Sequence, residues 1–336
     1  MNKLTKIGVS ALCGSLAGIS AANAGDLSVA GGADMTWMSK SDATTGNPLG
    51  IGSNYTLSGS GDLDNGWSVA LSIAMTNANA YSNTNITVGI PGLGDVRFDQ
   101  GTSGTGIQRM DDMTPTAWEE ADGAGLSAGI NKITGTSAGG TIEVTPEAMP
   151  AGLTARVAYS LDADGGASVG DKASGGSSGV MDSGYDVTLE ASSDLHGMDG
   201  LTVYAGMSNV DQFQNASGVN GDKEETVIGF KYAVGGFTFG YQQTDEETGT
   251  TGTTGYENVA YGITFNVNDN LSVSYGHVES DGEGASADPE ADSVQAAYTM
   301  GGATFRIAEV DVKNQTYSSA ANADLDATII SLGLAF

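Results

Sequence analysis

The chain has 336 residues and a formal net charge of −29, yet only 16% of its residues are charged. The acidic excess comes from a shortage of Lys and Arg, with 12 basic against 41 acidic residues, so the sequence is neither a nucleic-acid binder nor a typical charge-rich disordered chain. Its 51 glycines follow no Gly-X-Y period and it has 6 prolines, which excludes collagen.

Residues 1–24 have the composition of a secretory signal peptide. They contain two lysines, a short apolar run over residues 7–19 and the A-x-A sequence Ala22-Asn23-Ala24. The apolar run is too short to cross a hydrocarbon core of about 30 Å. We therefore expect residues 1–24 to be cleaved and residues 25–336 to form a single exported domain.

The rest of the chain alternates between large apolar and small residues with a period of two. At the C-terminal end, residues 328–336 place Ile330, Leu332 and Leu334 on one face and Ser331 and Gly333 on the other. A soluble β-sandwich needs large apolar residues on its inner face, whereas a small, polar inner face can line water. The pattern predicts an all-β fold, a transmembrane antiparallel β-barrel.

About sixteen strands are expected, an even number that lets a barrel close with both termini on one side. In chain order they cover residues 26–39, 51–63, 66–76, 84–90, 94–100, 139–145, 152–160, 183–192, 200–208, 223–233, 237–244, 256–265, 271–279, 291–300, 302–312 and 325–336. Short and long connections alternate, as in bacterial barrels, and this strand number leaves an aqueous lumen.

Three short motifs carry a family resemblance. They are the expected mature start Gly25-Asp26-Leu27-Ser28-Val29, the segment Gly94-Asp95-Val96-Arg97-Phe98 before a long third loop, and the terminal Leu334-Ala335-Phe336. With the signal peptide, they resemble the Gram-negative general porins, especially those of alphaproteobacterial type.

The resemblance implies several properties of the chain. It implies a homotrimer of 16-stranded barrels in the outer membrane, surrounded by lipid and lipopolysaccharide, through which small hydrophilic solutes and ions diffuse passively. It also implies that the third loop folds into the lumen as a constriction, and that Phe336 is an assembly signal. Gly59 and Gly61 flatten the outer face of the second strand, which suits close approach of subunits.

The third loop, residues 101–139, is far longer than a hairpin needs, which is typical of functional loops. It carries five carboxylates between residues 111 and 122, with Arg109 just before them; these are Asp111, Asp112, Glu119, Glu120 and Asp122. Folded inward, they would form the acidic side of a pore constriction; the alternative is a solvated loop outside the barrel. Thr114 followed by Pro115 predicts the start of a short helix in this loop.

Strand phase predicts a basic wall that faces these acids. Four basic residues fall on the small, inward face near mid-strand: Arg97, Arg156, Lys231 and Arg306. Asp95 and Asp99 flank Arg97 on the same face and are further candidates for the constriction. The alternative is that these bases simply pair with wall acids such as Asp186 and Glu190.

One strand conflicts with the pattern. Over residues 302–312, the phase set by Phe305 and Ile307 would place Glu309 and Asp311 in lipid. We therefore predict a bulge near Ala308 or, alternatively, a subunit interface that covers the two acids.

The acidic charge favours a weak preference for cations, because carboxylates at a pore attract cations and exclude anions. Acidic clusters in the expected outer loops could also bind Ca²⁺ or Mg²⁺ and bridge to lipopolysaccharide, although no segment matches a calcium loop. The alternative is that they are unpaired surface acids. The clusters are Asp245-Glu246-Glu247 and the group Asp281, Glu283, Asp288 and Glu290.

Competing functions have weaker support in the sequence. An enzyme is not expected: the two histidines, His196 and His277, have no nucleophile or carboxylate placed for catalysis, and no nucleotide or metalloprotease motif is present. A substrate-specific channel would need an aromatic track in its lumen, for which only Tyr204 and Trp118 qualify. A structural or adhesin barrel would need an occluded pore and large external domains.

Overall fold

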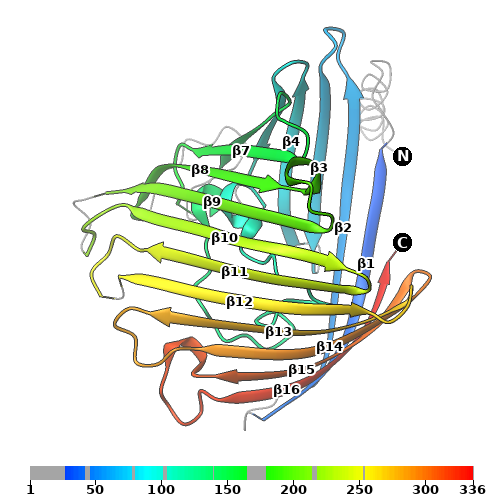
Figure 1. The fold of residues 1–336 in the computed structure, drawn as a ribbon, viewed down its shortest axis with the longest axis vertical. Coiled ribbons are helices and arrows are strands. Elements are labelled where there is room, and N and C mark those ends of the chain that lie inside the picture. The colour runs from blue at the N-terminus through cyan, green and yellow to red at the C-terminus, as the bar shows by residue number, and fades with distance from the viewer. Residues whose placement is uncertain are drawn as a thin grey trace, which may run out of the picture.

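The computed structural model is a closed barrel of sixteen antiparallel strands, in which β1 pairs with β16 (Figure 1). It describes residues 27–41, 46–77, 80–100, 104–138, 140–164, 179–213, 218–252 and 254–335. The predicted all-β barrel and its strand number are confirmed. The predicted signal peptide and the assembly signal at Phe336 lie outside the described residues and stay predictions.

Each strand pairs with its neighbours in the sequence, so the sheet is a continuous meander. The strands are β1 (Ser28–Lys40), β2 (Leu49–Asp62), β3 (Ser68–Thr76), β4 (Ala80–Ile90), β5 (Gly94–Asp99), β6 (Thr141–Pro146), β7 (Leu153–Ser160), β8 (Met181–Ala191), β9 (Leu201–Gln212), β10 (Lys223–Val234), β11 (Phe237–Glu247), β12 (Gly255–Asn266), β13 (Leu271–Gly282), β14 (Glu290–Met300), β15 (Ala303–Lys313) and β16 (Leu325–Ala335).

Helical segments are short in the described parts of the chain. They are η1 (Gly106–Met110) and η2 (Gly135–Ala138) inside the third loop, α2 (Ser193–His196) in a turn, and η3 (Gln315–Tyr317) in the last long loop. None of the described helices is long and apolar enough to span a membrane.

Several strands extend further toward the long loops than the sequence predicts. β11 continues to Glu247, β13 continues to Gly282, and β14 begins at Glu290. The prediction that Asp245, Asp281 and Glu290 lie in loops is therefore wrong. Polar residues continue the hydrogen-bonded ladder here because strand pairing does not require an apolar face.

The outer face of the barrel changes character along each strand from β9 to β16. The half near the short turns is apolar and aromatic, with Phe237 and Phe265 stacked at 4.5 Å between ring centroids. The half near the long loops carries outward-facing acids, here called the outer acidic belt: Asp211, Glu224, Asp245, Glu247, Glu257, Glu279, Asp281, Glu290, Asp292, Glu309, Asp311 and Asp326. Because a charge at the bilayer midplane costs about 2–4 kcal/mol and far less near the interface, the belt marks where the apolar band ends.

The predicted bulge near Ala308 is wrong. β15 pairs without a register shift with both β14 and β16, so Glu309 and Asp311 stay on the outer face as part of the belt. Val310 and Val312, which the bulge was meant to turn outward, instead face the interior and are 2% and 1% exposed. The interior is apolar at this height because the third loop packs there.

Candidate functional site

The third long loop folds into the barrel and lines the inner wall from β6 round to β16. Its described residues, 104–138 and 140, are called the inner loop below. The backbone of Figure 1 shows this segment passing behind β8 to β14, and contacts from both of its ends and its middle to that wall confirm the placement. The predicted inward fold of the third loop is therefore observed.

Wall carboxylates hold both ends of the inner loop. At its start, Asp186 of β8 accepts a hydrogen bond from the Ile107 amide at 3.1 Å, and Glu143 of β6 pairs with Arg109. At its end, Asp186 also accepts from the hydroxyl of Thr136 at 2.9 Å. Asp186 thus anchors the loop instead of pairing with a wall base.

A second anchor lies one strand pair further round the wall. Glu225 of β10, 1% exposed, accepts hydrogen bonds from the backbone amides of Thr134 at 2.9 Å and Gly135 at 2.6 Å. The same carboxylate binds Lys223 at 2.6 Å, and Lys223 reaches Glu246 of β11 at 3.2 Å. A buried charge is stable only when its partners are in place, so this group fixes the returning half of the loop.

The middle of the inner loop lies against a row of wall glycines. A Cβ on Gly240 would lie 2.3 Å from Pro115 Cδ, and one on Gly262 would lie 2.7 Å from the Pro115 carbonyl oxygen. The two glycines are opposite each other on β11 and β12, so the small inner face accepts the loop at van der Waals distance. Small residues expected to line water here make room for protein instead.

The helix predicted to start at Thr114 is absent. The backbone amides that follow are satisfied by the wall: Ala117 donates to Ser274 Oγ at 2.9 Å, and Trp118 donates to Gln295 Oε1 at 3.0 Å. The Gln295 side chain in turn donates to the Glu119 carbonyl at 2.7 Å. Polar wall residues therefore replace the hydrogen bonds that a helix would have supplied.

The second half of the loop alternates between buried and exposed residues. Ala124, Leu126 and Ala128 are buried against Val310 and Ile329 of the wall, and the residues between them are exposed. The same alternation of apolar and small polar residues is present in the sequence and indicates a segment with one apolar side. The last long loop closes over it, with Thr316 donating its amide to the Ala128 carbonyl at 2.8 Å.

Four of the five predicted acids gather with one lysine. Lys132 lies 2.6 Å from Glu120 and 3.7 Å from Asp122, and Asp112 is hydrogen-bonded to Glu120. Asp111 lies close enough to Lys132 and Glu120 to interact with both charges. We call these five residues the loop acid cluster. Ionised, it carries more negative than positive charge.

The shared environment separates the pKa values of the two hydrogen-bonded carboxyls. Loss of hydration, the hydrogen bond to Glu120 and the Glu120 charge raise the pKa of Asp112 to about 7. Burial acts in the same direction on Glu120, but hydrogen bonds from Asp112 and Lys132 outweigh it and lower the pKa of Glu120. Burial raises the pKa values of Asp111 and Asp122, opposed by Lys132. When the pair holds one proton, that proton therefore lies on Asp112, and it is lost around pH 7.

The fifth acid, Glu119, lies apart from the cluster beside an interior cavity of about 620 Å³. Arg306 of β15 lines the same cavity, binds Asp34 of β1 at 2.8 Å and stacks over Trp118 at 5.7 Å from the ring centroid. Burial and the neighbouring Glu120 charge raise the pKa of Glu119, and Arg306 opposes the shift. Opposite charges thus meet across this space, as the predicted constriction requires.

The other predicted wall bases face inward, but their partners are mainly acids of the wall. Arg97 binds Asp99 on its own strand at 2.5 Å, and Arg156 lies among Arg109, Glu143 and Glu190. Lys231 keeps the inward phase opposite Gly240, and Asp95 lies near the short-turn end of β5. The structure therefore places Arg306 beside Glu119, whereas Arg97 pairs with Asp99 and donates to the Gly104 carbonyl at the start of the loop at 3.4 Å.

Sequence reasoning missed the wall residues that hold the loop. Glu143, Glu225, Gln242 and Gln295 all bind inner-loop backbone, and none was selected as a site residue. In the sequence, these residues are marked by their positions on the inward face of strands in a barrel that has a very long loop. That signal cannot separate a side chain facing water from one facing the loop.

Comparison with known proteins identifies the family. A family model described as Gram-negative porin matches residues 8–304 of the chain. The chain belongs to the Gram-negative porin family. This family and the barrel fold make it an outer-membrane channel protein of a Gram-negative bacterium.

Solved porin structures share the fold at low sequence identity. An OmpF of Salmonella typhi in complex with daunomycin is 13% identical with a TM-score of 0.68, and covers 92% of this chain and 97% of its own. A triple mutant of the Rhodopseudomonas blastica porin is 15% identical with a TM-score of 0.58, covering 93% and 100%. OmpT of Vibrio cholerae is 11% identical with a TM-score of 0.63, covering 92% and 97%. Comparison with curated proteins gives no significant match.

Proposed function

We propose that this porin is a water-filled channel with a weak preference for cations, through which small hydrophilic solutes diffuse passively. The observation that carries the proposal is the loop acid cluster, in which Lys132 neutralises only part of the charge of four carboxylates. Carboxylates on a loop folded into the lumen raise the local concentration of cations and lower that of anions.

The position of Glu119 and Arg306 on the same cavity supports the same function. Opposite charges on the loop and on β15 border one cavity, so a solute there experiences a transverse field. Such a field orients dipolar solutes and ordered water, and an apolar solute must displace that water. The arrangement favours small polar molecules without a dedicated binding pocket.

Single-channel recording tests the proposal. The full chain is inserted in a planar bilayer, and the reversal potential is measured under a salt gradient for wild type and for a variant in which loop acids are neutralised: Asp111→Asn, Asp112→Asn, Glu119→Gln and Glu120→Gln. We expect the cation preference to fall in the variant. A matched control neutralises the same number of charges on the outer acidic belt: Asp245→Asn, Glu257→Gln, Asp281→Asn and Asp311→Asn.

The outcomes separate the candidate functions. Unchanged selectivity in the loop variant would keep the channel but contradict the acidic constriction, as would an equal loss in the control. A protein that is folded and inserted yet gives no openings would favour a structural barrel. A substrate-specific channel has less support, because Tyr204, one of its two candidate lumen aromatics, is 3% exposed and hydrogen-bonded to Gln242.

We also propose that the channel is a homotrimer in contact with lipopolysaccharide. The outward positions of β1 to β5 carry no charged side chain among the described residues, and Gly59 and Gly61 flatten β2, which supports subunit contact through this face. The outer acidic belt would bind Ca²⁺ or Mg²⁺ and bridge to lipid phosphates, since hard cations prefer carboxylate oxygens. Stepwise openings in threes, and their loss on chelation, are the corresponding measurements.

A further inference from the structure

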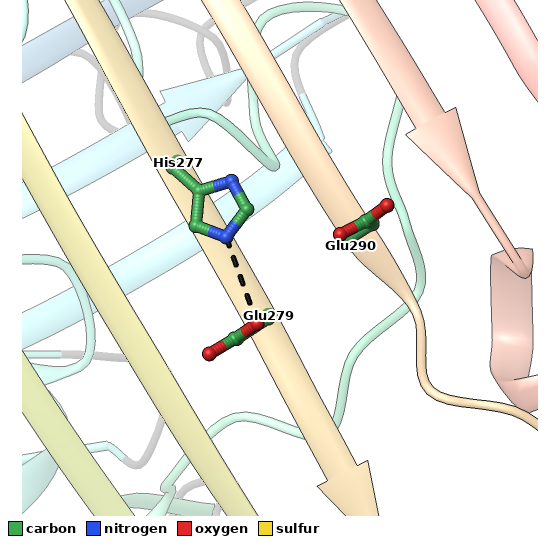
Figure 2. A group of neighbouring side chains, drawn as sticks. All are labelled: His277, Glu279 and Glu290. Carbon is green, nitrogen blue, oxygen red and sulfur yellow. Dashed lines mark ion pairs between the residues drawn. The ribbon is translucent and has the colours of Figure 1, made fainter.

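On the outer wall, a histidine and two glutamates converge at the boundary between β13 and β14. One ligand atom from each of His277, Glu279 and Glu290 lies within 4.8 Å of the others (Figure 2). His277 and Glu279 share the outer face of β13, and the strand register places Glu279 directly opposite Glu290. Strand pairing therefore brings the three side chains together.

The imidazole of His277 is held in one orientation. Its Nδ1 lies 2.9 Å from Asp292 Oδ1, the oxygen that also accepts the Tyr275 hydroxyl at 2.5 Å. The ring stacks on Tyr261 at 4.8 Å, and His277 is only 9% exposed. With the proton on Nδ1, the lone pair is on Nε2.

That Nε2 atom has no hydrogen-bond partner among the described residues. Its nearest acidic neighbour, Glu279 Oε2, lies 3.8 Å away, beyond hydrogen-bonding distance, as the dashed line in Figure 2 marks. A lone pair and two carboxylates therefore face one small space. Lys313 of β15, which lies opposite Glu290 in the strand register, pairs with Glu290 and offsets part of this charge.

The donor set indicates the kind of cation. One imidazole nitrogen with two carboxylate oxygens suits Zn²⁺ and related transition metals, whereas Ca²⁺ and Mg²⁺ prefer oxygen ligands throughout. Tetrahedral Zn²⁺ with bonds of about 2.0–2.1 Å needs ligand atoms about 3.4 Å apart, so atoms that lie up to 4.8 Å apart would close in by at most about 1.4 Å. The Glu279 side chain is 57% exposed and can make that movement.

We propose that His277, Glu279 and Glu290 form a binding site for a divalent transition cation of the Zn²⁺ class on the outer wall of the barrel. Asp292 is a positioning residue, since a carboxylate that accepts from the second ring nitrogen fixes the tautomer and orientation of a ligating histidine. Three protein ligands leave one tetrahedral position for water.

Metal binding to the folded full chain in detergent tests the site. After chelation, the protein is dialysed against Zn²⁺ in excess Mg²⁺, and the metal content per chain is measured. We expect binding in wild type and its loss in His277→Gln. His196→Gln is the matched control, because His196 lies in the exposed helix α2, far along the chain from the site. Asp292→Asn should weaken binding by about 10- to 100-fold and change the visible spectrum of bound Co²⁺.

Three results would overturn the site. One is equal binding by wild type and His277→Gln, the second is loss of binding in His196→Gln, and the third is displacement of Zn²⁺ by an equal amount of Mg²⁺, which would reduce the feature to an acidic surface. If His277→Gln does not fold, Glu279→Gln keeps the test decisive, since this side chain is 57% exposed and approaches His277 no nearer than 3.8 Å.

Discussion

The proton on Asp112 predicts that ion selectivity depends on pH near neutrality. Its pKa of about 7 means that about one-tenth of the channels carry ionised Asp112 at pH 6 and about nine-tenths at pH 8. The loop acid cluster therefore gains nearly one negative charge over this interval. Cation preference should rise with pH, with a midpoint near pH 7 that belongs to the coupled pair of Asp112 and Glu120.

The size of the effect can be calculated from the interaction of a permeating ion with one charge across water. For an ion that passes about 10 Å away, the screened interaction is about 0.15 kcal/mol in 0.1 M salt and about 0.3 kcal/mol in 0.01 M salt. Cations are stabilised by this energy near the carboxylate and anions are destabilised by it. The cation-to-anion permeability ratio should therefore rise by about 1.7-fold in 0.1 M salt and about threefold in 0.01 M salt.

Reversal potentials measured at pH 6, 7 and 8 give the ratio directly, and Asp112→Asn is the decisive variant. Its amide can donate to Glu120 as the protonated acid does, so the variant should behave at every pH like wild type at pH 6. Asp245→Asn, on the outer wall, should leave the titration intact. A wild type that shows no change from pH 6 to 8, or an Asp112→Asn channel that keeps the midpoint, would refute the reasoning.

Two predictions concern how the inner loop is held. Gly262→Val places a side chain where Pro115 lies 2.7 Å from the glycine Cβ position, and should destabilise the docked loop by about 1–3 kcal/mol, measured as faster protease cleavage of the inner loop while the barrel stays intact. Unchanged cleavage would contradict the docking. Glu225→Gln leaves Lys223 with Glu246 as its carboxylate partner and the Thr134 hydroxyl, and should lower the free energy of unfolding in urea by about 3 kcal/mol; a loss below about 1 kcal/mol would show that the anchor is not needed.

The strands could be predicted from the sequence because each responds to one simple environment. Lipid selects large apolar residues on the outer face and the interior selects small or polar residues, so residues 237–244 and 256–265 already showed β11 and β12. The ends of strands were less predictable. Asp245 and Glu246 continue β11 because backbone pairing continues above the apolar band, and no side-chain pattern records that.

The candidate site was predictable in its residues but not in its pairings. The alternation of the strands correctly placed Arg97 and Arg306 on the inward face, and the family resemblance correctly implied that the third loop folds into the lumen with its acids. The alternation of inward and outward residues does not give distances along the barrel or around it. It therefore could not show that Arg97 binds Asp99. Nor could it show that Arg306 reaches Asp34 and Trp118. It also could not identify Lys132 as the partner of the loop acids.

The wrong prediction of a bulge in β15 shows that the apolar pattern in this barrel records two environments, the bilayer and the inner loop. Phe305 and Ile307 face outward in the half of the strand near the short turns, and Val310 and Val312 face inward in the other half, with unbroken pairing throughout. A bulge is not needed, because the apolar environment itself changes sides: it is the bilayer in one half and the inner loop in the other.

The neighbouring strands change sides in the same way. On β16, Leu332 and Leu334 face outward whereas Ile329 is buried inside against the inner loop, and on β13 Tyr275 faces outward whereas Val278 is buried inside. A reversal of apolar phase without a bulge therefore marks both the upper edge of the lipid-facing band and the stretch of wall where the loop docks. The sequence of β13 to β16 would therefore have located the inner loop on this side of the lumen.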